Sequence, residues 1–184
     1  LQPAAVGTVE RNSVDVAAAV KTIVQAAPHA VVQISAYKSC AAFVREARKA
    51  GYGGTFYNVS FVGSQALADE LGKEGRGVMI SQVMPHPFTT TTAIAREYLD
   101  AVKRGGDKQP PNYSSMEGYV AAKVFAEGLR RAGRGVTREG LVAALESLSR
   151  LDLGGFAVGF SPAKHSGSSF VDLTVLTEDG KVRR

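Results

Sequence analysis

The first half of the chain alternates short apolar runs with segments in which apolar residues recur every three or four positions. The runs have the length of strands: residues 4–9, 30–34, 55–59 and 77–83. The intervening periodicity predicts three amphipathic helices; Ser13 and Ser39 are expected to cap the first two, and the third follows Ser64. This βαβαβαβ order predicts an α/β fold, with a mostly parallel sheet and helices on both faces, because right-handed crossovers place helices against the sheet.

The rhythm of the second half is different. Two prolines within residues 84–88 cannot continue a central strand or a helix, so this segment is expected to be a crossover between domains. Beyond it the pattern predicts three helices, at residues 92–104, 115–132 and 137–148. A polar loop at residues 105–113 joins the first two helices, and two strands follow at residues 156–160 and 170–176. Asp179 and Gly180 form a tight-turn signal. The helix at 115–132 is apolar on nearly every side, which predicts burial among other elements.

Composition and charge narrow the class of protein. The chain has 184 residues, of which 45% are hydrophobic and 21% charged, and these proportions are typical of a water-soluble globular protein. No run approaches a membrane span and no signal peptide is present in this chain, so we expect a mature, processed or truncated product. The net charge of +5 is spread over the last turns of predicted helices without interleaved aromatic residues. We therefore expect no nucleic-acid partner.

A search for reactive motifs is nearly empty. The chain has no phosphate-binding loop, no His-Glu metal motif and no nucleophile elbow, so we predict no catalytic residues, no metal site and no cofactor. His29, His86 and His165 fall in predicted turns or linkers and are expected to be surface residues. Cys40 has no partner for a disulfide and is expected to be a small apolar helix residue. The glycine cluster at 51–54 precedes a strand, which is the reverse of the dinucleotide-binding order.

A ligand in an open α/β sheet binds beyond the carboxyl ends of the parallel strands. Those ends fall at residues 10–12, 36–38, 60–63 and 84–88. Tyr37 offers an aromatic face and a hydroxyl, Ser60 offers a donor and an acceptor, and Phe61 lies beside it. The alternative is that Tyr37 only covers a helix N-terminus and that Phe61 packs in the core.

Seven segments in order along the chain resemble the leucine/isoleucine/valine-binding protein family of periplasmic solute receptors. They are Ser-Ala-Tyr at 35–37 and the segments at 43–52, 56–63, 77–82, 118–122, 140–145 and 156–160. The resemblance implies a type I periplasmic-binding fold whose two lobes close on a ligand by hinge motion. It also implies that residues 1–84 belong to the second lobe, 85–163 to elements of a first lobe that is largely missing, and 164–184 to the second lobe again.

The resemblance also implies roles for individual residues. Tyr37 matches a ligand-contacting tyrosine of the family, and Tyr113 or Ser114 lies near an aromatic contact from the first lobe. Ser60 falls where the amino-acid binders hold an acidic residue that pairs with the ammonium group of the ligand. Because a buried ammonium without a counter-charge is strongly disfavoured, this departure speaks against an amino-acid ligand.

The sequence therefore predicts a periplasmic, extracytoplasmic receptor, not an enzyme, which delivers a small solute to the membrane permease of an ABC transporter. The solute is expected to be amino-acid-like, an amide or an aromatic acid. Two alternatives stay open: a sensory or regulatory domain of the same fold, and an α/β enzyme with a divided site, for which the chain offers only Ser60, Lys38 and Glu10. A sheet lacking an interior strand is also expected to self-associate or to pair with the missing N-terminal half.

Overall fold

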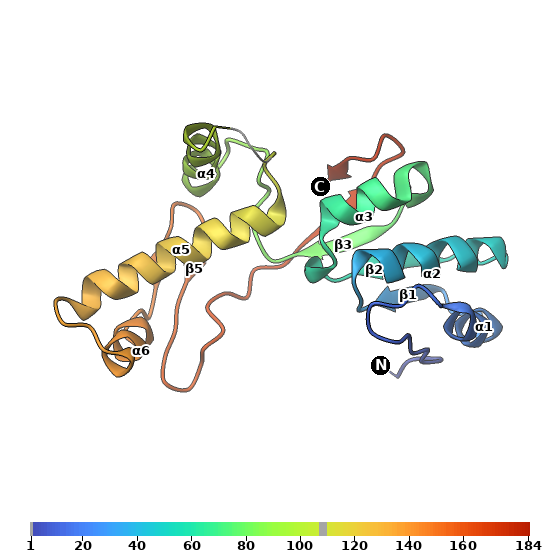
Figure 1. Cartoon of the computed structure of the whole chain (residues 1–184), viewed down its shortest axis with the longest axis horizontal. Coiled ribbons are helices and arrows are strands. Elements are labelled where there is room, and N and C mark those ends of the chain that lie inside the picture. The colour runs from blue at the N-terminus through green and yellow to red at the C-terminus, as the bar shows by residue number, and fades with distance from the viewer. Residues whose placement is uncertain (1, 107–109) are drawn as a thin grey trace. The chain divides into compact units, whose positions relative to one another are not determined.

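The computed structural model describes residues 2–106 and 110–184, which form two compact units (Figure 1). The first unit contains the chain up to Gln82 together with Asp172–Arg184, and the second is Val83–Val171. The lobe boundaries predicted from the sequence, after residues 84 and 163, stay a prediction. Residues 107–109 of the predicted polar loop lie outside the described residues.

The first unit is built on a five-stranded sheet in the order β1-β2-β3-β6-β7. Its strands are β1 (Ala30–Gln33), β2 (Thr55–Asn58), β3 (Met79–Gln82), β6 (Asp172–Leu176) and β7 (Val182–Arg183). Its helices are α1 (Ala17–Gln25), α2 (Tyr37–Lys49) and α3 (Ser64–Leu71), with short 3₁₀ turns η1 (Ser60–Val62) and η2 (Gly72–Gly75). Strands β1 to β3 are parallel, and β6 and β7 add to the sheet in antiparallel pairing.

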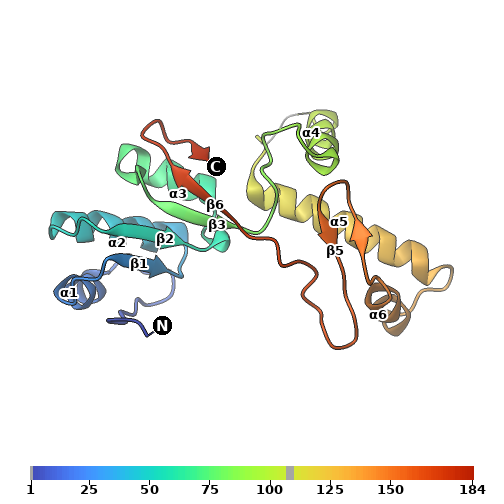
Figure 2. The same cartoon turned by 180° about the vertical axis from the view of Figure 1, so that it is seen from behind.

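Helices α2 and α3 lie on the same face of this sheet, behind the strands as seen in Figure 2. Side-chain hydrogen bonds fix them there: Gln33 Nε2 donates to the carbonyl of Cys40 in α2, and Gln82 Nε2 donates to the hydroxyl of Ser64 in α3. On the opposite face Val32 and Leu173 are 66% and 48% exposed. The expected second helical layer is thus not seen over these residues, because β1, β2 and β3 follow in one direction and right-handed crossovers then place both helices on one face.

Three expectations for the N-terminal region were wrong. Residues 4–9 form no strand: they have no pairing partner, and β1 is the edge of the sheet. Ser13 does not cap α1; its hydroxyl accepts from the Asp15 N–H in the loop before the helix. Ser39 lies inside α2, which begins at Tyr37, and its hydroxyl donates to the Ser13 carbonyl at 2.5 Å. In both cases a tertiary contact or a local turn uses the hydroxyl that the sequence assigned to a cap.

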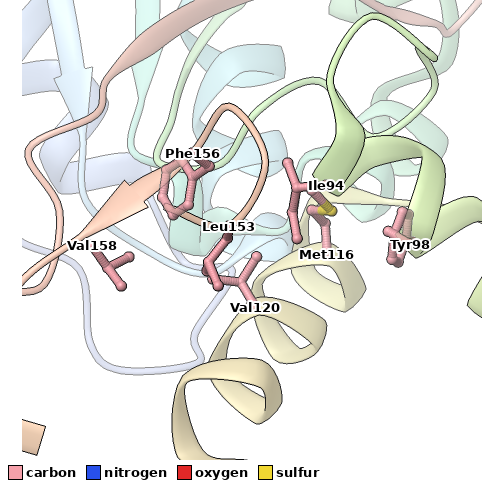
Figure 3. Close-up of a cluster of buried hydrophobic side chains, with 7 residues drawn as sticks. All are labelled: Ile94, Tyr98, Met116, Val120, Leu153, Phe156 and Val158. Carbon is pink, nitrogen blue, oxygen red and sulfur yellow. The ribbon is translucent and has the colours of Figure 1, made fainter. Parts of the chain in front are cut away.

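The second unit packs helices against a small hairpin. Its elements are α4 (Ala93–Arg104), α5 (Tyr113–Ala132), α6 (Arg138–Glu146) and the antiparallel strands β4 (Leu151–Asp152) and β5 (Ala157–Val158). Figure 3 shows its core, to which α4, α5 and the hairpin contribute: Ile94, Tyr98, Met116, Val120, Leu153, Phe156 and Val158. Thr92 and Asn112 cap α4 and α5, since the Thr92 hydroxyl accepts from the Ala95 N–H and the Asn112 side chain from the Ser115 N–H.

Helix α5 is less buried than its composition predicts. Only four of its residues are buried, at Tyr113, Met116, Val120 and Gly128, and Phe125 is 52% exposed. The prediction of burial on nearly every side is therefore wrong for this chain, because α4, α6 and the hairpin cover only part of a 20-residue helix. An apolar surface remains on the rest of it.

Basic residues of the second unit pair with nearby carboxylates at the surface. Arg130 and Arg131 both donate to Glu127, each at 2.8 Å, and these hydrogen bonds, first that of Arg130, lower the pKa of Glu127 to about 2. Lys123 of α5 pairs with Glu97 of α4. The positive charge is thus distributed over local ion pairs, as expected for solvated helix surfaces.

Candidate functional site

Tyr37 and Ser60 follow neighbouring parallel strands at the same edge of the first unit's sheet. Gln33 at the end of β1 is in register with Asn58 at the end of β2, so the segments after both strands emerge side by side. Tyr37 is the first residue of α2 and is half-buried, and the Nζ of Lys38 lies 6.0 Å from the centroid of its ring. This is the edge at which an open α/β sheet binds its ligands.

Phe61 lies in the 3₁₀ turn Ser60–Val62 and points away from the core. Val62 takes the buried position of this turn, whereas Phe61 is 63% exposed. The alternative that Phe61 packs in the core is therefore wrong. Gly63 ends the turn in a left-handed backbone conformation with φ of 78°, which residues other than glycine rarely adopt. Its N–H donates to the Ser60 carbonyl. The turn thus presents a half-buried Ser60 and an exposed aromatic ring together.

A row of buried carboxamides lies beneath this edge, on the face covered by α2 and α3. Gln33, Asn58 and Gln82 stand at the last positions of β1, β2 and β3. Gln82 Nε2 donates both to Ser64 and, at 2.9 Å, to the Thr174 hydroxyl. Within the described part of the chain, neither amide atom of Asn58 has a hydrogen-bond partner. The row supports the segment that carries Ser60 but is itself too buried to meet a solute.

Tyr113 lies in the second unit, where it contacts two aromatic rings that were not among the predicted site residues. It begins α5, is buried, and its ring contacts those of His86 and Phe88. The expectation that His86 is a surface residue is wrong, since it is half-buried in this cluster. His29 and His165 are exposed, as expected. The sequence did hold one signal for this cluster, the two prolines within residues 84–88, which restrict the backbone beside His86 and Phe88. We interpreted them only as a break between domains.

Cys40 is the remaining reactive side chain that the sequence singled out. Cys40 is fully buried in α2, where burial raises the pKa of its thiol to about 11, so the predicted structural role is confirmed. Among residues 2–106 and 110–184 no cluster of histidine, cysteine, aspartate or glutamate side chains has the makings of a metal site. None of the helices in the described part of the chain combines the length and apolar character needed to cross a membrane.

Comparison with known proteins decides what kind of chain this is. The family model described as periplasmic binding protein matches residues 3–181, which is nearly the entire chain. This chain belongs to the periplasmic binding protein family. The predicted family resemblance is thereby confirmed, and the fold and family are those of substrate-binding proteins. None of the curated proteins matches the chain significantly.

Solved structures of periplasmic binding proteins share the fold. A possible leucine/isoleucine/valine-binding protein from Rhodopirellula baltica SH 1 matches with a TM-score of 0.90 and 29% identity, over 97% of this chain and 49% of that one. A substrate-binding periplasmic protein from Ralstonia solanacearum matches with a TM-score of 0.82 and 33% identity, over 94% of this chain and 50% of that one. A type 1 periplasmic binding protein from Bordetella pertussis Tohama I matches with a TM-score of 0.84 and 20% identity, over 100% of this chain and 52% of that one. At this identity the match supports the fold alone.

These matches confirm the predicted class, an α/β fold of the type I periplasmic-binding kind. They also set its extent, because this periplasmic binding protein spans about half the length of the structures it resembles. The solute and the transport partner of the whole protein are therefore treated below as proposals.

Proposed function

We propose that this chain is part of an extracytoplasmic receptor that binds a small solute and delivers it to the permease of an ABC transporter. The observation that carries the proposal is the juxtaposition of Tyr37 with Ser60 and Phe61 at the carboxyl edge of β1 and β2. The ring and hydroxyl of Tyr37, the hydroxyl of Ser60 and the exposed ring of Phe61 are groups that suit a small organic solute. Residues 1–84 and 164–184 would then belong to one lobe of the receptor, and residues 85–163 to the other.

Ser60 bears on the class of solute. A neutral hydroxyl stands where, by the family resemblance, amino-acid binders hold a carboxylate, so an ammonium group at this position would lose its counter-charge. Within the set of amino-acid-like solutes, amides and aromatic acids, we therefore expect a neutral or carboxylate-bearing solute to bind more tightly than branched-chain amino acids.

Calorimetric titration of the full-length protein with benzamide, benzoate, phenylalanine and leucine tests both statements. We expect benzamide or benzoate to bind and leucine to bind at least tenfold more weakly. The variant Ser60→Glu should recover leucine binding, whereas Gln25→Glu, which adds the same charge at the exposed end of α1, should not. Submicromolar leucine binding by the unaltered protein would refute the assigned preference. Turnover of a chromogenic ester or amide, with no solute bound, would refute the receptor.

Uptake of the bound solute separates transport from sensing. In vesicles that contain an ABC permease with its ATPase from the same organism, a transport receptor stimulates solute uptake. A sensory domain of the same fold binds the solute and leaves uptake unchanged.

The free edge of β1 indicates a polypeptide partner. Within the described residues β1 pairs only with β2; Val32 of this strand is 66% exposed, and Ile34, just after the strand, is 74% exposed. No charged residue or bulge protects this edge, and unprotected apolar edges recruit further strands. We propose that the edge is covered in the functional protein by the remainder of a longer chain or by a second copy.

Light scattering on the isolated 184-residue chain measures this directly. We expect a mass clearly above 19.4 kDa for the isolated chain, and co-purification of the two parts when the remainder of the protein is expressed with it. Replacing Val32 by lysine, which blunts the edge, should shift the isolated chain toward the monomer. A cooperative, solute-binding monomer of the unaltered chain would show that the edge needs no partner.

A further inference from the structure

Three aromatic rings of the second unit meet in mutual edge-to-face contact. The ring centroids of His86 and Phe88 are 5.3 Å apart, those of His86 and Tyr113 are 6.0 Å apart, and those of Phe88 and Tyr113 are 6.5 Å apart. The interplanar angles of 72°, 74° and 89° are those at which aromatic pairs attract each other most. We call these three residues the aromatic cluster.

Two prolines restrict the segment that carries two of the rings, which bends at residues 83–84 and turns at residues 87–88. Pro85 and Pro87 are buried, whereas His86 is half-buried and Phe88 is 43% exposed, so buried and accessible positions alternate. Proline fixes its own φ and restricts the residue before it to extended conformations. The Phe88 N–H also donates to Nδ1 of His86 at 3.3 Å. His86 and Phe88 therefore project together from a rigid segment.

The third ring rests on an equally well-fixed support. Tyr113 is the first residue of α5, whose start is capped by Asn112. The hydroxyl of Tyr98 in α4 accepts from the Asn112 N–H at 3.0 Å and lies 2.5 Å from the hydroxyl of Ser115. A core tyrosine thus fixes the residues on either side of Tyr113, and the cluster is organised before any solute arrives.

Packing alone does not account for the exposed ring of this cluster. Leaving a large aromatic side chain in water forfeits burial, yet Phe88 is held in place by two other rings instead of turning into the core. A preorganised, partly open group of aromatic rings is the usual wall of a small-molecule site, because it accepts a flat apolar surface without reorganising.

We propose that His86, Phe88 and Tyr113 form an aromatic subsite that takes the ring, or another flat apolar part, of the solute. The inference rests on the proposed receptor function and adds to it two contact residues, His86 and Phe88, and a substrate class, aromatic carboxylates and amides. Phe88 is the specificity-determining residue of this subsite because its ring is the most accessible of the three.

Paired titrations of the full-length protein with benzoate and cyclohexanecarboxylate isolate the contribution of the flat ring. Both probes carry one carboxylate on a six-membered ring, and only benzoate is planar. The unaltered protein should bind benzoate at least threefold more tightly. Phe88→Leu should weaken benzoate roughly three- to tenfold and leave cyclohexanecarboxylate within about twofold. Phe88→Tyr, which keeps the ring, should retain the preference.

Phe125→Leu is the matched control, because it removes another exposed phenylalanine of the same unit. Phe125 lies twelve residues beyond Tyr113 on α5, or about 18 Å along its axis, so its replacement should leave both affinities unchanged. Thermal melts of each variant verify that the fold is kept.

The possible failures are distinguishable. If no solute binds to the unaltered protein, the receptor function fails and the subsite fails with it. If solutes bind but the two probes bind equally, if leucine alone binds, or if Phe88→Leu leaves the benzoate preference intact, the receptor function stands and the aromatic subsite is overturned.

Discussion

Replacement of Asn58 by leucine is expected to stabilise the protein. Asn58 is 2% exposed at the end of β2, and neither its Oδ1 nor its Nδ2 meets a partner among the described residues. A buried polar group without a hydrogen bond costs about 1–3 kcal/mol. Leucine has the same branched arrangement of side-chain heavy atoms and adds favourable apolar burial, so Asn58→Leu should raise the free energy of unfolding by about 1–3 kcal/mol.

The assay is thermal and urea unfolding of Asn58→Leu beside Asn112→Leu. A protein of this size shifts its melting temperature by roughly 2–4 °C per kcal/mol, which a melt resolves easily. Asn112 caps α5, so its loss should lower stability by about 1 kcal/mol. The two asparagines are thus predicted to respond with opposite signs. Destabilisation by Asn58→Leu would refute the reasoning.

Three further predictions concern packing, reactivity and pH. Gly159→Ala should destabilise by about 1–3 kcal/mol in urea titrations, because a Cβ there would overlap the carbonyl oxygen of Ser149, whereas Gly118→Ala, in open space within α5, should stabilise by up to about 1 kcal/mol. Cys40 should resist iodoacetamide at pH 8 until urea unfolds the protein, as read by mass spectrometry; rapid labelling of the folded chain would contradict its burial. The carboxyl of Glu127 should titrate near pH 2 by NMR. Because its folded pKa is lowered, the stabilisation by its ion pair is present above the ordinary glutamate pKa and is lost as the pH falls toward 2; a midpoint near 4 would contradict the pairing.

The sequence by itself determined the elements and the family. Apolar runs and helical periodicity placed β1, β2, β3 and the six α-helices within a few residues, because burial on one side of an element leaves a period that the chain itself records. The positions of Tyr37 and Ser60 at a sheet edge also followed, since parallel strands carry their ends to the same side. The ordered segments shared with the binding-protein family did the rest.

Only the tertiary structure decided which contact is made by a side chain that could make several. Ser39 was a reasonable helix cap by sequence, but the fold brings the Ser13 carbonyl within hydrogen-bond distance of its hydroxyl. Val62, and not Phe61, is the residue of the 3₁₀ turn that packs in the core. The aromatic cluster was equally hidden, because His86 and Tyr113 are far apart along the chain and their contact depends on how α5 packs. Local propensity is a property of a segment. Contact between distant residues depends on the packing of the whole unit, which a short pattern does not encode.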